Sequence, residues 1–212
     1  MDRDLLRLTG ITGIAALIAV TILFLFVDRY VSVSAHMLKD GIVFKIAEIT
    51  SLFGDHNLYN VLISMGFISG GILALYRGLT PGVRALLYVC VTVSSVMILG
   101  ETFKWVFGRY RPVMHFEHAL YGFQWFSSQG KMHSLPSGHS FRVFSAMTAL
   151  GLVLPRWRVL FLTLAALVAI SRVVVTRHFP SDVVAGAYLG IFAALWVWRI
   201  IQGQKPHEIN GV

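Results

Sequence analysis

Residues 10–27 read GITGIAALIAVTILFLFV, a run without a single charge that ends directly at Asp28 and Arg29. An uncharged, apolar run of this length can cross the hydrocarbon core of a bilayer as a helix. The run follows a charged N-terminus, as the apolar core of a signal peptide would. No small-residue cleavage site precedes Asp28, so we expect the segment to be retained as a first membrane span.

Five further apolar runs continue this pattern, and we predict spans at 58–76, 83–103, 138–154, 159–176 and 183–201. Segment 36–53 is too polar to cross a membrane, yet its apolar residues recur at helical spacing. This spacing indicates either a helix lying in the membrane interface or an amphipathic helix packing on the bundle. The sequence therefore predicts an all-α single domain over residues 1–212. It is a bundle of six transmembrane helices with an interfacial helix after the first span.

The composition agrees with a membrane protein. Hydrophobic residues make up 56% of the chain and charged residues 13%, whereas soluble domains carry about 25% charged residues. The net charge is +8, but the basic residues are spread between the apolar runs, so we expect no nucleic-acid partner. Cys90 is the only cysteine, which excludes an intramolecular disulfide and a metal site built from cysteines.

The short connections predict the orientation in the membrane. Arg77 and Arg84 flank one connection, and Arg156 and Arg158 occupy another, with no acidic residue in either. Basic residues concentrate in short cytoplasmic loops. We therefore predict a multi-pass protein of the cytoplasmic (inner) membrane with both termini in the cytoplasm. The long connection 113–136 then lies on the periplasmic or exterior side.

Three polar segments interrupt the apolar pattern at the predicted outer ends of the spans: Lys104-x6-Arg111-Pro112, Pro136-Ser137-Gly138-His139, and Ser171-Arg172-x5-His178-x3-Asp182. Taken singly, the first two have structural explanations, such as a cation reaching the headgroups or a serine that starts a helix. The third is harder to explain in this way, because a histidine four residues from a carboxylate near a buried arginine is costly without a purpose. Charges at membrane depth are costly and usually face a cavity or one another. Three such segments on one side therefore predict one site.

These residue types suit phosphoryl transfer. Lys104 offers a point charge, while Arg111 and Arg172 offer planar forks for bidentate contact with phosphate oxygens. Ser137 and Gly138 stand where a helix N-terminus presents unpaired N–H groups to an anion. Two histidines and one carboxylate remain for bond making. One histidine, oriented by Asp182, can attack phosphorus, and the other can give a proton to the leaving oxygen.

The three segments resemble the signatures K-x6-R-P, P-S-G-H and S-R-x5-H-x3-D of the type 2 phosphatidic acid phosphatase (PAP2) superfamily, and every signature position is matched. The resemblance implies that His178 is the nucleophile that forms a phosphohistidine, that Asp182 orients it, and that His139 is the acid. It also implies that the phosphate is bound by Lys104, Arg111, Ser137, Gly138 and Arg172. It implies catalysis without a metal or another cofactor.

Small bacterial membrane members of this superfamily act on phosphatidylglycerol phosphate, undecaprenyl diphosphate or the 1-phosphate of lipid A. The resemblance thus implies a lipid phosphatase, whose expected partners are a phosphorylated lipid and the bilayer, with no obligatory protein partner. A lipid phosphotransferase and a non-catalytic lipid-binding or transport protein remain as alternatives. Polar residues outside the signatures are the candidates for specificity: Arg109, Arg142, Arg177, Lys131, His115, His118 and His133.

Arg142 is the most informative of these candidates, because it follows His139 by one helical turn and so faces the same side. Contact with the lipid headgroup and a purely structural role as a paired cation are equally consistent with the sequence. For the three histidines of the 113–136 connection, exposure to solvent is the favoured interpretation.

Overall fold

Helices form almost all of the protein. The computed structural model describes residues 3–39 and 41–203, and within these ranges it contains no strand, only one isolated bridge between Arg109 and Phe123. The long helices are α1 (Arg3–Ile22), α4 (His56–Arg77), α5 (Pro81–Phe107), α7 (Gly138–Val153), α8 (Arg158–Val174) and α9 (Pro180–Gly203). The shorter elements are the π-helical turn η1 (Leu23–Val27), α2 (Asp28–His36), α3 (Ile42–Ser51), η2 (Leu52–Gly54), α6 (Pro112–His118), η3 (Gly130–Met132) and η4 (Pro155–Trp157).

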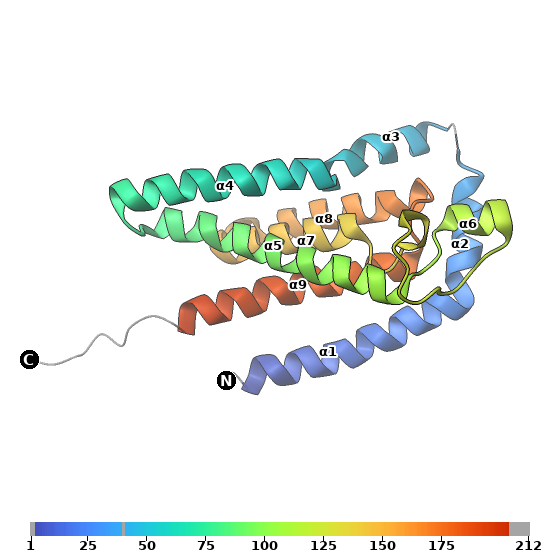
Figure 1. Ribbon diagram of the computed structural model, residues 1–212, viewed down its shortest axis with the longest axis horizontal. Coiled ribbons are helices and arrows are strands. Elements are labelled where there is room, and N and C mark those ends of the chain that lie inside the picture. Colours follow the sequence, from blue (N-terminus) through green and yellow to red (C-terminus); the bar gives the residue numbers. More distant parts are fainter. Residues whose placement is uncertain (1–2, 40, 204–212) are drawn as a thin grey trace, which may run out of the picture.

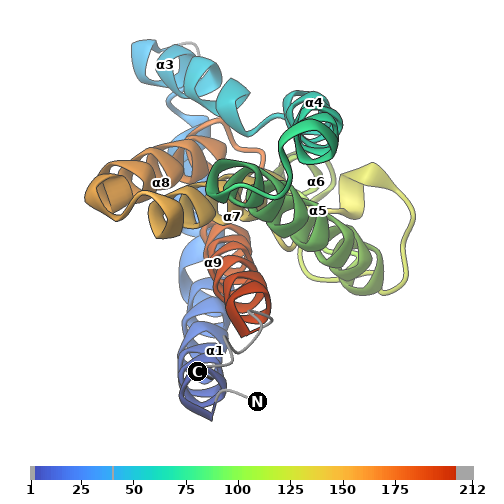
Figure 2. The same ribbon diagram turned by 90° about the vertical axis from the view of Figure 1, so that its left-hand side faces the viewer.

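Helix α7 occupies the centre of the bundle, where α5, α8 and α9 pack around it (Figure 2). Its side chains Phe141, Val143 and Ala149 are fully buried. Two glycines of α9 allow the backbones of α7 and α9 to come close. A Cβ on Gly186 would lie 2.7 Å from the Ser137 carbonyl oxygen, and one on Gly190 would lie 2.6 Å from that of Phe141. This packing fixes the start of α7 against the start of α9.

Within the described residues, five helical stretches are long and apolar enough to cross a membrane: Arg3–His36, Ile42–Arg77, Pro81–Phe107, Pro155–Val174 and Pro180–Gln202. The sixth predicted span, 138–154, forms α7, which has 16 residues. At 1.5 Å per residue it is about 24 Å long, and the neighbouring helices surround it. The predicted all-α membrane bundle is confirmed, with α7 as a shorter central helix.

The segment after the first span differs in detail from the prediction. Helix α2 lies across the axes of the long helices at one end of the bundle (Figure 1). Helix α3 instead leads through η2 into α4 and packs against α8, with Ala47 and Ser51 buried and Ile42 and Ile46 exposed. Of the two interpretations of segment 36–53, packing on the bundle therefore describes α3. The element that crosses the bundle end is α2.

The end of α5 shows how the sequence places the first polar segment. Gly108 ends the helix with φ = 54°, in the left-handed region, and its N–H donates to the Lys104 carbonyl at 2.9 Å. A Cβ here would lie 1.7 Å from the Gln124 carbonyl oxygen, so only glycine fits this close approach. The chain consequently turns between Lys104, on the helix, and Arg109, which follows the turn.

The two ends of the bundle differ in what they carry. The start of α1, the α4–α5 connection and the end of α9 lie together at one end (Figure 1). Helices α2 and α6 and the long loop after α6 lie at the other end. Residues 204–212 and 1–2 fall outside the described ranges. The three polar segments meet at the second end, on which the candidate site is built.

Candidate active site

His178 and Asp182 form the centre of the site. His178 lies in the turn between α8 and α9, and Asp182 lies in the first turn of α9. Both are buried, and His178 Nδ1 is 3.6 Å from Asp182 Oδ2. The backbone N–H of His178 donates to the Arg172 carbonyl at 3.2 Å, which closes the turn. Because Nδ1 faces the carboxylate, Nε2 is the ring nitrogen left for chemistry.

Asp182 is held by donors from several elements. Its Oδ2 accepts from the Phe179 N–H at 2.8 Å and from the Ser134 hydroxyl at 2.6 Å, and its Oδ1 accepts from Arg109. A carboxylate with this many donors stays ionised and keeps one orientation. The sequence did not single out Ser134, which is a serine in an irregular loop without a distinguishing local pattern.

The surroundings of His178 favour its neutral form. Burial lowers the pKa of His178 to about 3, against the opposing contact with Asp182, and the charge of Arg111 acts in the same direction as burial. An imidazole must be neutral to use a nitrogen lone pair as a nucleophile. His178 is thus in the protonation state that an attacking group needs.

The start of α7 forms the floor of an anion site. Ser137 caps the helix, and its own N–H donates to the Asp182 carbonyl at 3.0 Å. A Cβ on Gly138 would lie 2.9 Å from Lys104 Nζ and 3.1 Å from Arg142 Nη1. Glycine thus lets two cations come close to a helix N-terminus, where unpaired N–H groups already favour an anion.

Lys104 is already paired within its own helix. Its Nζ lies 2.6 Å from Glu101 Oε1, one turn earlier in α5. Glu101 was not among the residues predicted from the sequence, although a spacing of three residues on a helix is a signal for such a pair. A phosphate that binds here competes with Glu101 for the lysine.

Arg142 lies deep in the site. It is 3% exposed, and its Nε and Nη2 donate to the Gly54 carbonyl at 3.1 and 2.9 Å. Its Nη2 is also 3.4 Å from His139 Nδ1. Since arginine only donates, Nδ1 of His139 is the acceptor in this contact, which places the ring proton on Nε2. Arg142 therefore orients His139 and joins α7 to η2.

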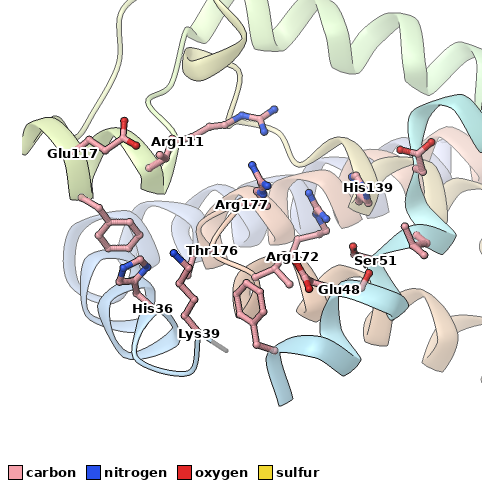
Figure 3. A pocket seen from close by; sticks show the side chains of 16 residues that line it. His36, Lys39, Glu48, Ser51, Arg111, Glu117, His139, Arg172, Thr176 and Arg177 are labelled. Atoms are coloured by element: carbon pink, nitrogen blue, oxygen red, sulfur yellow. Dashed lines mark hydrogen bonds between the residues drawn. The ribbon is translucent and has the colours of Figure 1, made fainter. Parts of the chain in front are cut away.

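A cavity of about 670 Å³ lies next to the start of α7, and His139 is among the residues that line it. Figure 3 shows the guanidinium groups of Arg111, Arg172 and Arg177 gathered beside His139. The Nε atoms of Arg111 and Arg172 are buried and meet no acceptor among the described residues. The hydrogen-bonding capacity of these two N–H groups is therefore unused within the described residues. The remaining lining residues are His36, Lys39, Phe44, Glu48, Ser51, Leu52, Asp55, Val113, Phe116, Glu117, Val175 and Thr176.

The other specificity candidates are placed differently. Arg109, one of the polar candidates for specificity, is fully buried behind Asp182 and does not line the cavity; charge at the end of a span does not reveal which way a side chain turns. His118 is exposed, as expected, whereas His133 is half-buried and its Nε2 lies 2.8 Å from the Ser127 carbonyl. His115 is also half-buried. None of these three histidines lines the cavity, nor does Lys131.

The donor set of the site consists of cations, N–H groups and imidazoles. In residues 3–39 and 41–203 there is no group of three or more His, Cys, Asp or Glu side chains arranged to hold a metal ion. The one carboxylate of the pair, Asp182, is already engaged by Arg109, Ser134 and the Phe179 N–H. The positive charge that faces the cavity is supplied by arginine and lysine.

Known proteins are similar to this chain over different lengths. The chain is 36% identical over 108 residues to the lipid A 1-phosphatase of Rhizobium johnstonii, which is 51% of this chain and 44% of that protein. It is 37% identical over 105 residues to the undecaprenyl-diphosphatase of Sulfolobus acidocaldarius, covering 48% and 49% of the two chains. The chain thus spans about half the length of the curated relatives it matches.

A solved structure matches over nearly the whole length. The transmembrane PAP2 type phosphatidylglycerolphosphate phosphatase from Bacillus subtilis superposes with a TM-score of 0.57 at 21% identity, covering 92% of this chain and 98% of that one. This likeness shows a common fold. The sequence pattern of the PAP2 superfamily matches residues 85–206, a range that contains all three polar segments. By this match, and with the signature residues brought together at one end of a helical bundle, the chain belongs to the PAP2 superfamily.

Proposed function

We propose that the protein is a lipid phosphatase that hydrolyses a phosphate monoester or diphosphate of a membrane lipid through a phosphohistidine at His178. The observation that carries the proposal is the buried, neutral His178 with Nδ1 facing Asp182, beside a cavity lined by cations and His139. A protein that only binds lipid has no need of an oriented nucleophile next to a second histidine.

In the first step the lone pair of His178 Nε2 attacks phosphorus. The bond between phosphorus and the lipid oxygen breaks, and its electron pair stays on that oxygen. For this step His139 carries a second proton, which the bound phosphate dianion favours, so that the imidazolium gives its Nε2 proton to the oxygen and becomes a neutral imidazole. The imidazole of His178 becomes positively charged because Nδ1 keeps its proton, and Asp182 stabilises that charge. The products of this step are a dephosphorylated lipid and a phosphohistidine.

In the second step water replaces the lipid oxygen. His139, now lacking its proton, takes one from the water as the water oxygen attacks phosphorus. The P–N bond breaks, and its electron pair returns to His178 Nε2. Inorganic phosphate leaves, and both histidines regain their starting protonation states.

The cations supply binding and charge stabilisation in both steps. Arg111 and Arg172 line the cavity with buried, unused Nε donors. Lys104 and the Gly138 N–H meet at the start of α7, and the Ser137 hydroxyl lies in the same turn. Fixed donors placed where charge develops stabilise the transition state without reorganising. Arg177 and Lys39 also line the cavity and suit the headgroup of the lipid.

The proposed location is the cytoplasmic membrane, with both termini in the cytoplasm and the site facing the periplasm or exterior. The short basic connections support this orientation. Arg77 and Arg84 flank the α4–α5 connection, at the end of the bundle opposite to the site (Figure 1). Basic short loops remain on the cytoplasmic side during insertion.

Release of inorganic phosphate by the purified protein in detergent micelles tests the proposal. The substrates are phosphatidylglycerol phosphate, undecaprenyl diphosphate and lipid A 1-phosphate, compared with His178→Ala and with His118→Ala as the matched control, since His118 is exposed and outside the cavity. We expect phosphate release from at least one lipid, unchanged in His118→Ala and lost in His178→Ala. Phosphate transfer to an added acceptor lipid in place of release, or full activity of His178→Ala, would contradict it.

A further inference from the structure

Three charged side chains form a buried cluster behind the site. Arg109 is 1% exposed, and Asp28 and Asp182 are 0% exposed. Arg109 Nη2 donates to Asp28 Oδ2 at 2.5 Å, while Nη1 donates to Asp182 Oδ1. Buried ions cost free energy unless they are paired and hydrogen-bonded. Two carboxylates on one guanidinium give the cluster a net charge of −1, so the second carboxylate, Asp28, needs an explanation.

Asp28 contacts two residues that adjoin Asp182: Ser181, which precedes it in the chain, and Arg109, which forms an ion pair with it. Asp28 Oδ1 accepts from the Ser181 N–H at 3.0 Å, and its Oδ2 accepts from the Ser181 hydroxyl as well as from Arg109. Ser181 directly precedes Asp182 in the first turn of α9. Asp28 therefore binds the backbone that carries Asp182 and also the guanidinium that is bound to Asp182.

The position of Asp28 depends on an irregularity in the first span. The π-helical turn Leu23–Val27 separates α1 from α2, and Asp28 is the first residue after it. Such turns rotate the following residues relative to a regular α-helix and frequently occur at functional sites. Asp28 also lies outside the range 85–206 that matches the family pattern. The pattern shared by the family therefore does not include this contact.

Aromatic rings exclude water from the cluster. The Arg109 guanidinium carbon lies 4.8 Å from the ring centre of Phe179, 5.0 Å from that of Phe24 and 5.8 Å from that of Tyr121. The Tyr121 hydroxyl donates to the Phe24 carbonyl at 2.5 Å, which holds the ring in place. In such surroundings charges act on one another more strongly than in water.

The net charge of the Asp28–Arg109–Asp182 cluster affects how well the positive charge on the His178 ring is stabilised during the reaction. Without Asp28, Arg109 and Asp182 would form a neutral pair, and the positive charge that develops on the His178 ring would face no net opposite charge. With Asp28 present, the Arg109 charge is offset and the cluster keeps one negative charge for the imidazolium. The geometry points to Asp28 as a positioning residue that offsets Arg109, so that Asp182 stabilises the positively charged imidazole ring of the phosphohistidine. This inference rests on the proposed function.

The variant Asp28→Asn tests the inference, because it keeps the size of the side chain and one acceptor oxygen while removing the charge. We expect phosphohistidine formation and kcat to fall about 10- to 100-fold, the range typical of groups that orient a histidine through a carboxylate. KM and the affinity for vanadate should be unchanged, because the residues that bind phosphate are intact. The matched control is Ser181→Ala, which removes the hydroxyl bound to both Asp28 and Arg109 and leaves all three charges; it should slow the reaction much less.

The measurements are rapid-quench trapping of the phosphoenzyme, steady-state kinetics, vanadate affinity and thermal unfolding, all in detergent. The double variant Asp28→Asn/Arg109→Gln also leaves a net charge of −1, and it stands in for the single variant if that does not accumulate as folded protein. We expect its rate to exceed that of Asp28→Asn and to stay within about tenfold of wild type, a difference of at most about 1.4 kcal/mol in the barrier.

The results that differ from these expectations overturn either the inference or the proposed function. Wild-type phosphoenzyme formation in Asp28→Asn overturns the inference, and so does equal slowing of Asp28→Asn and Ser181→Ala, which would make Asp28 an anchor for α9. Loss of vanadate binding in Asp28→Asn overturns it as well, since the site itself would have changed. If the wild-type protein forms no phosphoenzyme that depends on His178, the proposed function fails first, and this inference fails with it.

Discussion

His139→Ala is expected to separate the two kinds of leaving group that a phosphatase can meet. A lipid alkoxide leaves poorly and needs a proton as its bond to phosphorus breaks, whereas p-nitrophenolate leaves without one. His139 lines the cavity with its ring proton placed on Nε2 by the contact with Arg142. If that proton goes to the lipid oxygen, the variant loses general acid catalysis for the lipid only.

The structure limits the side effects of this change. Arg142 keeps its two bonds to the Gly54 carbonyl at 2.9 and 3.1 Å without His139, so the groups that bind phosphate should stay in place. General acid catalysis contributes roughly 10²- to 10⁴-fold, which corresponds to about 2.7–5.4 kcal/mol in the barrier. We expect the lipid reaction to slow by this amount. Phosphorylation by p-nitrophenyl phosphate should slow by less than about tenfold, or about 1.4 kcal/mol.

Single-turnover rates for both substrates, with purified protein in excess, provide the assay. His178→Ala should abolish both reactions, because attack on phosphorus precedes any difference between leaving groups. His118→Ala should leave both unchanged, since its side chain is exposed and away from the cavity. Equal slowing of the two substrates in His139→Ala would show that His139 binds phosphate and is not the acid.

Activity should persist in excess chelator, and vanadate should inhibit as a five-coordinate mimic of the reacting phosphate; loss of activity that Mg²⁺ or Zn²⁺ restores would refute a metal-free reaction. Asp182→Asn should lower kcat by up to about 10⁴-fold, as for the carboxylate that orients a catalytic histidine elsewhere; a wild-type rate would remove Asp182 from the mechanism. Burial lowers the pKa of His178 to about 3 from 6.5, so its protonation should reduce phosphoenzyme formation only as the pH falls towards 3. A limb near pH 6.5 that remains after correction for the second ionisation of the substrate phosphate, near pH 6, would contradict this. An impermeant label should reach the 113–136 loop only from outside the cell, and labelling from the cytoplasm would reverse the orientation.

The sequence was sufficient to predict those features of the fold and the site that depend on the spacing of residues along the chain. Apolar runs predicted the long helices, and the three signatures predicted which segments meet, because each motif lies at a helix end. The spacing of three residues also placed Arg142 near His139 correctly. Its two bonds to Gly54 were not predictable, because that carbonyl belongs to η2, which no local pattern connects to α7.

The largest omission concerns Asp28 and Arg109. In the sequence Asp28 only marks where an apolar run stops, and Arg109 is one of several cations after α5. Their burial follows from the π-helical turn Leu23–Val27 and from the turn at Gly108, which decide the directions of these side chains. Helical periodicity assumes a regular helix, so it cannot report an irregular turn or a partner 81 positions away.

The bond between Asp28 and the Ser181 N–H joins residues that are 153 positions apart. Ribosomes deliver the N-terminal part of a chain first, so Asp28 and Arg109 enter the membrane well before α9 carries Ser181 and Asp182 to them. During synthesis Arg111 and Arg172, which line the cavity, are made before His178 and Asp182. The growing chain therefore completes that pair only when α9 is inserted, and a chain cut short before α9 leaves Arg109 without Asp182. Such a fragment would lack the carboxylate that orients His178 and would be inert, while Arg109 would keep its ion pair with Asp28.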